Sequence, residues 1–447
     1  MARIYITNPG QEFREMPLLT KPIDQSGPVY EITEEKAQTM LGFGAAMTDS
    51  SAVVIKRLPE EKQRQLLHEI YSPEETGFNV TRICVGSSDY ADSIYDFAPV
   101  ADDMQMEHFD CSHDDENIIP ILQMAREENP DLYLYSSPWS PPGWMTTNGI
   151  MQGGFMRREC VDAYVLYYLK FIQYYKDHGL LINAMTAQNE TETDQLSRMP
   201  ACYWHPDIEA EFAVKMRKAL NENGFEDLDI WLMDHNFDLW RRVMYQLSDE
   251  EVRKAASAIA WHPYGGHAEA VKWVGSKYPQ MGHHWTEGWY VPAAARSDGD
   301  NLRTSYTLTR GYASYARGFL QAINNGIQSI TAWNIVLDEE GAPNAGPFNC
   351  RGTIEINRSS NQIRRSKEYY ALAHFSKFVK RGAKRLVTNS IMMPDNFDAA
   401  AFENPDGSVI MVVANTDHYD SPLGFSYKGK DYYTWVKRQS VNTIVFD

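Results

Sequence analysis

The stretch LLINAMTAQNETE, residues 180–192, changes character halfway along. Its first half is apolar apart from one asparagine, which is typical of a parallel strand buried on both faces. Its second half is polar and carries two carboxylates, Glu190 and Glu192, where the strand should end. Catalytic groups of parallel β/α barrels stand at the carboxyl ends of the strands. The stretch therefore predicts a barrel strand that presents an acidic group at its end.

The same pattern, a short apolar run followed by a helix-like segment, recurs from residue 39 to about residue 335. The candidate strands are 39–44, 78–86, 132–137, 182–189, 228–235, 258–263, 281–286 and 329–335. Helical periodicity lies between them, at 59–70, 117–127, 161–178, 207–222, 238–247 and 307–325. Eight alternating units predict parallel pairing and an α/β fold, the (β/α)8 TIM barrel. The alternative, an open doubly wound sheet, lacks a GxGxxG turn after its first strand.

Both ends of the chain read as strands outside the barrel. Residues 3–7 form a β-type run before a Pro-Gly turn, and several such runs follow residue 381. Two of these runs are separated by Asn404-Pro405-Asp406-Gly407, a hairpin signal. We therefore expect a catalytic barrel over residues 33–380 and a small side β-sandwich built from residues 1–32 plus 381–447.

The composition is that of a globular protein and restricts its partners. Of the 447 residues, 43% are hydrophobic and 23% are charged, which disfavours a disordered chain. No apolar run is long enough to span a bilayer, and the net charge of −18 disfavours nucleic acid. Five scattered cysteines and the lack of a visible leader predict a cytoplasmic protein with reduced thiols. We expect a neutral small molecule or oligosaccharide as ligand, and the oligomeric state stays open, a homodimer included.

Polar and aromatic side chains gather at the predicted strand ends. They are Asp49, Arg82, Asp89, Trp139, Trp144, Asn189, Glu190, His262, Tyr264, Glu287, Trp333 and Asn334. Glu190 and Glu287, after strands four and seven, can face each other across the barrel mouth. Two opposed carboxyls, one protonated and one ionised, are the machinery of glycoside hydrolysis. Asn189 is placed to donate to a sugar hydroxyl, and Tyr264 to hydrogen-bond the ionised carboxylate.

Other polar groups have simpler interpretations. Glu192 and Asp194 read as solvated loop residues, and the histidines at 262–267 and 283–284 do not match a zinc-protease HExxH helix. The ten carboxylates of residues 89–116 predict a solvated loop over the mouth, with calcium binding as the alternative, although EF-hand spacing is missing. We expect no metal and no cofactor. A metal-dependent hydrolase and a non-catalytic sugar-binding barrel are the alternatives from other classes.

Several motifs, in order along the chain, resemble those of the glucosylceramidase-like enzymes of glycoside hydrolase family 30. They are GFGAAMTDSSA (42–52), SPWSPPGWMTTNG (137–149), TAQNE (186–190), AWN (332–334) and HFSKFV (374–379). The resemblance covers roughly residues 40 to 415. It implies a (β/α)8 barrel with a side β-sandwich and a retaining double-displacement mechanism.

The resemblance also implies roles for individual residues. Glu190 would be the acid/base and Glu287 the nucleophile, with Arg82 and His262 as supporting residues. The pocket for the sugar would be lined by Asp49, Trp139, Asn189, Tyr264 and Trp333. A retaining mechanism requires the two carboxyl groups to lie about 5–5.5 Å apart.

The chain departs from the family pattern near the site. Thr191 stands where many relatives have Pro, and Pro263 stands where relatives of the lysosomal type have Trp. The stretch 287–290 also differs. We expect an exo-acting enzyme on a soluble β-glucoside rather than on a ceramide-linked lipid. β-Fucosidase, β-xylosidase and β-1,6-glucanase activities are the related alternatives.

Overall fold

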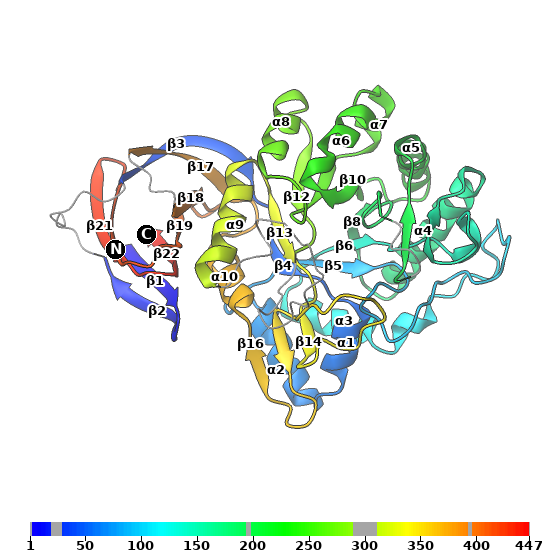
Figure 1. The fold of residues 1–447 in the computed structure, drawn as a ribbon, viewed down its shortest axis with the longest axis horizontal. Coiled ribbons are helices and arrows are strands. Elements are labelled where there is room, and N and C mark those ends of the chain that lie inside the picture. Colours follow the sequence, from blue (N-terminus) through cyan, green and yellow to red (C-terminus); the bar gives the residue numbers. More distant parts are fainter. Residues whose placement is uncertain (1, 19–28, 194–197, 289–310, 392–395, 447) are drawn as a thin grey trace.

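A closed barrel and a strongly curved sheet make up the molecule (Figure 1). The computed structural model describes residues 2–18, 29–193, 198–288, 311–391 and 396–446. Helices α9 (Tyr312–Asn324) and α10 (Lys367–Ser376) lie between the barrel and the curved sheet. The expected barrel and its side domain are thus both present.

The barrel consists of parallel strands in the order β10-β11-β12-β13-β4-β5-β6-β8. Their bounds are β4 Gly42–Ala45, β5 Val80–Cys84, β6 Tyr133–Ser137, β8 Ile182–Thr186, β10 Asp229–Asn236, β11 Ala258–His262, β12 Gly282–Trp285 and β13 Ser329–Ala332. Each lies within, or overlaps by most of its length, one of the eight predicted strands. The (β/α)8 class is confirmed.

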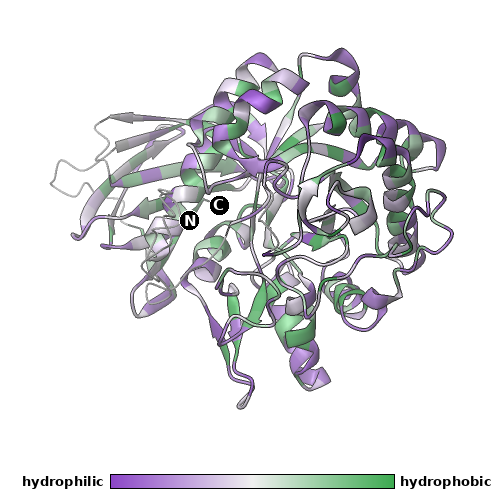
Figure 2. Ribbon diagram, turned by 45° about the vertical axis from the view of Figure 1, so that its right-hand side comes forward, coloured by the Kyte–Doolittle hydropathy of each residue, from purple (hydrophilic) through white to green (hydrophobic). Residues whose placement is uncertain are grey.

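Helices surround the barrel with their apolar faces inward (Figure 2). Their bounds are α1 Asp49–Lys56, α2 Glu60–Tyr71, α3 Ile118–Glu128, α4 Val161–Asp177, α5 Pro206–Glu222, α6 Trp240–Gln246, α7 Glu250–Ala255 and α8 Glu269–Lys277. In α4, Tyr164, Tyr168, Phe171 and Tyr175 recur at helical spacing and are all buried. The sequence did not predict α1, α7, α8 or α10, which have only six to ten residues each. Short 3-10 helices occur at Ser112–Asp115, Gly143–Met145, Arg158–Cys160 and Phe237–Leu239.

The interior of the barrel is filled beneath its mouth. Val80, Tyr135, Ala184, Trp231, Ala258 and Ala260 form a buried cluster there. The ring of Trp231 stacks on His284, with 4.0 Å between ring centroids. Strands β4 and β5 approach so closely that a Cβ on Gly44 would overlap the carbonyl oxygen of Val80. Because the base of the barrel is filled, the polar groups lie together at the opposite end, where the strands terminate.

The side domain is a nine-stranded sheet in the order β2-β1-β22-β19-β18-β17-β3-β20-β21. The strands are β1 Ala2–Asn8, β2 Gln11–Pro17, β3 Val29–Thr39, β17 Lys384–Ile391, β18 Phe397–Glu403, β19 Val409–Asn415, β20 Ser421–Tyr427, β21 Lys430–Val436 and β22 Ser440–Phe446. The sheet curves around one apolar cluster, which includes Met411 and Phe425. Its other face, with Phe402 and Val412, joins the main core against α9 and α10.

Two sequence predictions meet in this sheet. The Asn404–Gly407 turn joins β18 to β19 as expected: the Asn404 N–H donates to the Ser408 carbonyl at 2.8 Å, and Gly407 has a φ of 85°. Strand β3 pairs with β17 as far as Thr39. Residues 33–39 therefore lie in the side sheet, whereas the sequence analysis placed them in the barrel, because β3 leads straight into the first barrel strand.

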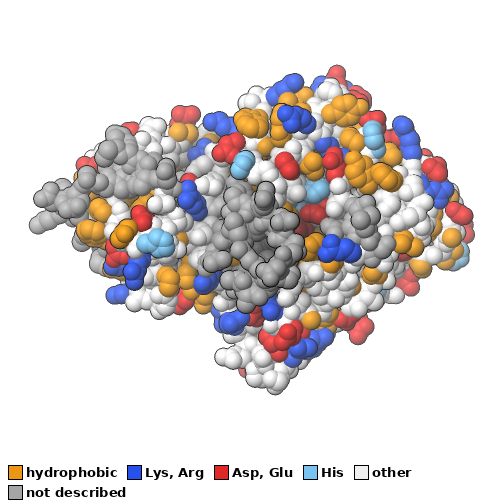
Figure 3. All heavy atoms as spheres, in the orientation of Figure 1, with side chains coloured by type: hydrophobic (Ala, Val, Ile, Leu, Met, Phe, Trp, Pro, Cys, Tyr) orange, Lys and Arg blue, Asp and Glu red, His pale blue; other side chains and the backbone are white. Residues whose placement is uncertain are grey.

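Two small sheets complete the described fold. One consists of β14 Val336–Asp338, β15 Ile354–Ile356 and β16 Ile363–Arg365, and the other of β7 Gln152–Phe155 and β9 Ala201–Tyr203. Among the described residues, no helix is long and apolar enough to cross a membrane. The five cysteines are buried and unpaired. On the face drawn in Figure 3, described acidic and basic side chains are interspersed.

Candidate active site

Glu190 and Glu287 meet at the mouth of the barrel. Glu190 follows β8 and Glu287 follows β12, so each stands at the carboxyl end of its strand. One carboxylate oxygen of each and one ring nitrogen of His262 all lie within 4.8 Å of one another. The Glu190 N–H donates to the carbonyl of Asp234 at 2.9 Å, which fixes the loop that carries it. The structure thus opposes the two glutamates that the sequence paired.

Arg82 lies beneath this pair and connects it to the barrel interior. The residue is fully buried, and its Nη1 donates to Glu287 Oε2 at 2.6 Å. Its Nη2 donates to Asn189 Oδ1 at 2.7 Å and to Asp234 Oδ2 at 2.8 Å. Its guanidinium also lies 4.6 Å from the ring centroid of Trp139. One buried cation therefore fixes a carboxylate, an amide and an aromatic wall together.

Asp234, at the end of β10, is a central residue that the sequence analysis missed. Its Oδ1 accepts hydrogen bonds from Thr286 Oγ1 at 2.6 Å and, at 3.1 Å, from His262 Nε2. Its Oδ2 accepts from Arg82 and from Thr186 Oγ1 at 2.8 Å. Burial acts to raise the pKa of Asp234, but Arg82 and His262 outweigh it and hold the pKa far below its usual range. Asp234 is therefore a permanent anion under the site.

His262 lies between Asp234 and Glu190. Its Nδ1 is 3.3 Å from Glu190 Oε1, and its Nε2 points to Asp234. Burial acts to lower the pKa of His262, but the charges and hydrogen bonds of Glu287, Asp234 and Glu190 raise it to about 9. The imidazole therefore carries a proton at neutral pH, one hydrogen bond away from Glu190.

The two glutamates differ in what surrounds their carboxylates. Glu287 accepts from Arg82 on one oxygen and from the Tyr264 hydroxyl, at 2.9 Å, on the other. Burial raises the pKa of Glu287, and the charge of Glu190 adds to this rise, while His262 and Arg82 oppose it. Burial acts in the same way on Glu190, but His235 and His262 outweigh it and lower the pKa of Glu190. At neutral pH the proton of the His262–Glu190 pair therefore lies on the imidazole.

A cavity of about 230 Å³ opens above these carboxylates. It is lined by Asp89, Trp139, Asn189, Glu190, Thr193, Met199, His235, Asn236, Tyr264, Glu287, Trp333 and Phe348. Trp139 and Trp333 stack on each other, with 4.8 Å between centroids, and form an aromatic wall. Four of the five residues predicted to line the pocket are here, namely Trp139, Asn189, Tyr264 and Trp333.

The fifth, Asp49, is not among the lining residues. It begins α1, and its Oδ2 accepts from the backbone N–H of Asp92 at 3.2 Å. Asp89, and not Asp49, lines the cavity beside Glu190 and Glu287. Burial raises its pKa well above the ordinary value, and its Oδ1 has no hydrogen-bond partner among the described residues. A buried carboxyl oxygen without a partner can form a hydrogen bond with a ligand.

Several residues at the site have an unusual backbone conformation with a positive φ. Glu190, Met233, Asp234 and Asn334 have φ values of 52°, 74°, 53° and 48°. Such values are uncommon outside glycine and concentrate at functional sites. The register of β10 against β11 shifts between Met233 and His235. This bulge brings His235 Nε2 to 3.9 Å from Glu190 Oε1, a placement that no spacing in the sequence indicated.

The remaining candidates fall outside the site. Glu192 pairs with Arg242 at 3.1 Å, and Asp194 lies outside the described residues. Burial lowers the pKa of His283 to about 4 and that of His284 to about 3, and both pack within the barrel wall. In the 89–116 segment, Asp114 is buried and accepts from the Tyr175 hydroxyl at 2.6 Å. This segment is partly packed into the core rather than wholly solvated.

Glu190, His262 and Glu287 form the one cluster of potential metal ligands among the described residues. Both oxygens of Glu287 are already hydrogen-bonded, one of them by the guanidinium of Arg82. A cation bound there would lie beside a buried positive charge. The donor set therefore fits a pair of hydrogen-bonded carboxyls better than a metal ion.

A TIM barrel with two carboxyls opposed over an aromatic-walled cavity defines a glycoside hydrolase. The chain matches the model of the glycosyl hydrolase family 30 TIM-barrel domain over residues 40–379 and that of the family 30 beta sandwich domain over residues 382–444. The chain belongs to glycoside hydrolase family 30, a family of β-glycosidases.

Its relatives have different named activities. The chain is 27% identical over 406 residues to the lysosomal acid glucosylceramidase of Mus musculus, covering 88% of this chain and 78% of that protein. It is 28% identical over 433 residues to an endo-1,6-beta-D-glucanase of Neurospora crassa, covering 92% and 86%. The solved structure of an endo-beta1,6-glucanase has a TM-score of 0.87 and 25% identity, covering 99% of both chains. SrfJ from Salmonella typhimurium, at 24% identity and a TM-score of 0.91 over 100% and 99% of the chains, shares the fold.

Proposed function

We propose that this protein is a retaining glucanase that cleaves β-1,6-linked glucan within the chain, by endo action. The observation that carries the retaining mechanism is the spacing of the carboxyls, since oxygens of Glu190 and Glu287 lie within 4.8 Å. Inverting enzymes need about 6.5–9.5 Å to admit a water between the two groups, whereas retaining enzymes need about 5–5.5 Å. The spacing leaves room for direct attack on the sugar.

In the first step Glu287 attacks the anomeric carbon. Arg82 and Tyr264 hold both of its oxygens, so the carboxylate is oriented before the sugar arrives. As the new bond forms, the bond to the leaving oxygen breaks, and that oxygen takes a proton from Glu190. The proton comes from the pair that Glu190 forms with His262, 3.3 Å away. The product of this step is a glycosyl ester on Glu287.

In the second step Glu190 acts as a base. It takes a proton from a water molecule that occupies the place of the leaving group, and the water oxygen attacks the anomeric carbon. The ester bond to Glu287 breaks, and the sugar leaves with its original configuration. Asn189 is held by Arg82 through its amide oxygen, and its NH₂ group can donate to a sugar hydroxyl. Asp89 supplies a carboxyl group on the cavity wall whose Oδ1 has no partner among the described residues.

Two sets of observations support a β-1,6-glucan as substrate. Relatives named as β-1,6-glucanases match this chain over 92% of its sequence and 99% of its structure. The site itself offers neutral and acceptor groups, which suit the hydroxyls of an uncharged sugar, and an aromatic wall for its apolar face.

The test of the mechanism uses matched substitutions of the two glutamates. Glu287→Ala should abolish turnover of an aryl β-glucoside, and added azide should restore it with a product of inverted configuration. Glu190→Gln should slow hydrolysis least for aryl glucosides with good leaving groups, and azide should rescue it with retention. Glu192→Gln is the control, with activity near wild type. Near-full activity of Glu287→Ala would refute the assignment.

An exo-acting β-glucosidase is the second candidate. The cavity of about 230 Å³ favours it, because this volume lies below the range of about 300–1,000 Å³ typical of larger ligands and suits a single ring. Chromatography of early products from a long β-1,6-glucan separates the two. Exo action releases only glucose, whereas endo action releases a ladder of oligosaccharides.

A further inference from the structure

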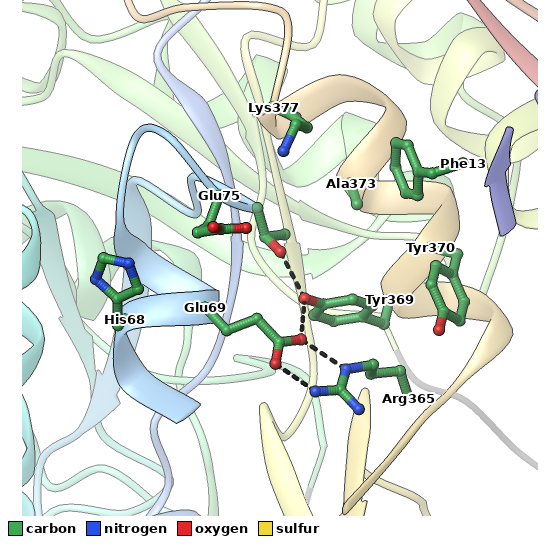
Figure 4. Close-up of a pocket in the computed structure, with 10 residues that line it drawn as sticks. Phe13, His68, Glu69, Glu75, Arg365, Tyr369, Tyr370, Ala373 and Lys377 are labelled. Carbon is green, nitrogen blue, oxygen red and sulfur yellow. Dashed lines mark hydrogen bonds and ion pairs between the residues drawn. The ribbon is translucent and has the colours of Figure 1, made fainter. Parts of the chain in front are cut away.

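A second cavity, of about 490 Å³, lies where the barrel meets the side sheet (Figure 4). Its walls come from separate elements: Phe13 from β2, Glu69 from α2, Arg365 from β16, and Tyr370 and Lys377 from α10 and its end. Its volume is within the range of about 300–1,000 Å³ that ligand sites have in proteins. None of these residues takes part in the catalytic site.

The floor of this cavity is built from fixed polar groups. Glu69 Oε1 accepts from Arg365 Nε at 2.6 Å and from the Tyr369 hydroxyl at 2.8 Å, and Glu69 Oε2 accepts from Arg365 Nη2. The hydroxyl of Tyr369 is also hydrogen-bonded to Thr76 Oγ1. These contacts tie α2, β16 and α10 together, so the floor is organised before any ligand binds.

The charges lining the cavity select a neutral ligand. Arg365 and Lys377 contribute two positive charges, and Glu69 and Glu75 contribute two negative charges. His68, at the edge, is 2.7 Å from Glu128 and has its own counterion. An anion or a cation would thus face charges of its own sign, whereas hydroxyl groups can use the donors and the acceptors alike.

Two aromatic rings border the cavity on the side of the β-sheet domain. The rings of Phe13 and Tyr370 are half-buried and have 6.3 Å between their centroids. Phe13 has a φ of 51°, which is an outlier for a bulky residue. Its N–H donates to Thr7 Oγ1 at 3.0 Å, and its ring stacks on His374 with 4.5 Å between centroids. The ring is thus held at the edge of the cavity by specific contacts.

We propose that this cavity binds a neutral saccharide, namely a segment of the glucan chain that the enzyme cleaves. Sugar hydroxyls would bond to the charged groups, and the apolar face of a ring would pack on Tyr370 and Phe13. The identity of the chain rests on the proposed function. A second contact raises the effective concentration of a long substrate at the active site but does nothing for a short one.

The kinetic test compares a long β-1,6-glucan with an aryl β-glucoside. Tyr370→Ala should raise KM for the polymer about three- to tenfold with kcat unchanged, and should leave the aryl glucoside unaffected. Tyr370→Phe keeps the ring and should behave as wild type, as should Tyr419→Ala, which removes a tyrosine that is 74% exposed on the side domain. Lys377→Ala, on another wall, should raise the same KM without removing a packed ring.

Direct binding separates this proposal from the proposed function. Affinity electrophoresis of the Glu287→Gln protein through gels containing β-1,6-glucan, β-1,3-glucan or xylan should show retardation that Tyr370→Ala weakens. If no aryl glucoside is cleaved, the proposed function fails while the gel result stands. Unchanged retardation and unchanged polymer KM in both Tyr370→Ala and Lys377→Ala would overturn the proposed site.

Discussion

At the level of single residues, His262 and Glu190 share one proton through the hydrogen bond between them. The raised pKa of His262, about 9, keeps that proton in place at neutral pH, and Asp234 beneath the ring is the anion that anchors it. Because the folded pKa lies above the ordinary value of about 6.5, the interaction stabilises the fold fully below pH 6.5 and is lost as pH rises through about 9.

The pH dependence of kcat/KM follows from this arrangement. We expect activity to fall as pH rises through about 9, when the shared proton leaves. On the acid side, we expect the midpoint of the fall in activity to lie above about pH 4.3, the ordinary pKa of Glu, because burial raises the pKa of Glu287. In His262→Phe, Glu190 must hold the proton alone, so the basic limb should move to lower pH. If the basic limb of the pH profile has the same midpoint in this variant as in the wild type, His262 and Glu190 do not share the proton.

Arg82 offers a test of stability at the same scale. Arg82→Met keeps the bulk of the side chain but leaves Asp234 and Glu287 without their buried cation. We expect the free energy of unfolding to fall by about 3–5 kcal/mol in a denaturant titration. Arg64→Met is the matched control, since Arg64 pairs with Glu60 and Glu127 at the surface, and its free energy of unfolding should stay close to that of the wild type. If the free energy of unfolding falls equally in the two variants, the buried ion pairs of Arg82 stabilise the fold no more than the surface pairs of Arg64.

Some site residues could be read from the sequence and others could not. Glu190, Glu287 and Tyr264 stand directly at or after strand ends, so their chemistry and position together marked them. Asp234 also ends a strand, but its carboxylate reaches the interior through a bulge and an unusual backbone conformation, which local patterns do not reveal. Asp49 had the right residue type and followed the first strand, but the start of α1 turns it away from the cavity.

At the scale of the element, the contact between β4 and β5 depends on the absence of a side chain at Gly44. A Cβ there would overlap the backbone carbonyl of Val80, which cannot move as a side-chain tip could. We expect Gly44→Ala to lower the free energy of unfolding by about 1–3 kcal/mol, measured by denaturant titration. An unchanged midpoint and slope would mean that the two strands can separate without cost.

The strands were easier to predict than the helices. Barrel strands are buried on both faces, so they form continuous apolar runs that are easily told from the polar loops around them. Helices α7 and α8 are short, with six and nine residues, and give too few turns for a clear periodicity. Residues 33–39 of β3 were assigned to the barrel because the polar part of the strand, Glu34 to Lys36, and its junction with the barrel carry no turn residues.

At the scale of the whole molecule, the barrel and side sheet share a core. Phe402 and Val412 of the sheet belong to the same buried cluster as Phe319 and Phe375 of α9 and α10. We therefore expect differential scanning calorimetry to show a single unfolding transition for the full chain. Two transitions, with the smaller one assigned to residues 382–444, would show instead that the sheet is an independent unit.

The packed base of the barrel has a further consequence. Trp231 and its neighbours fill the interior, so the floor of the site is solid protein. The departing half of the substrate and the water that replaces it must therefore come and go on the same side. Any alcohol present in excess can occupy that place and be joined to the sugar instead. For the proposed retaining mechanism we therefore expect the enzyme to lengthen glycans as well as to shorten them.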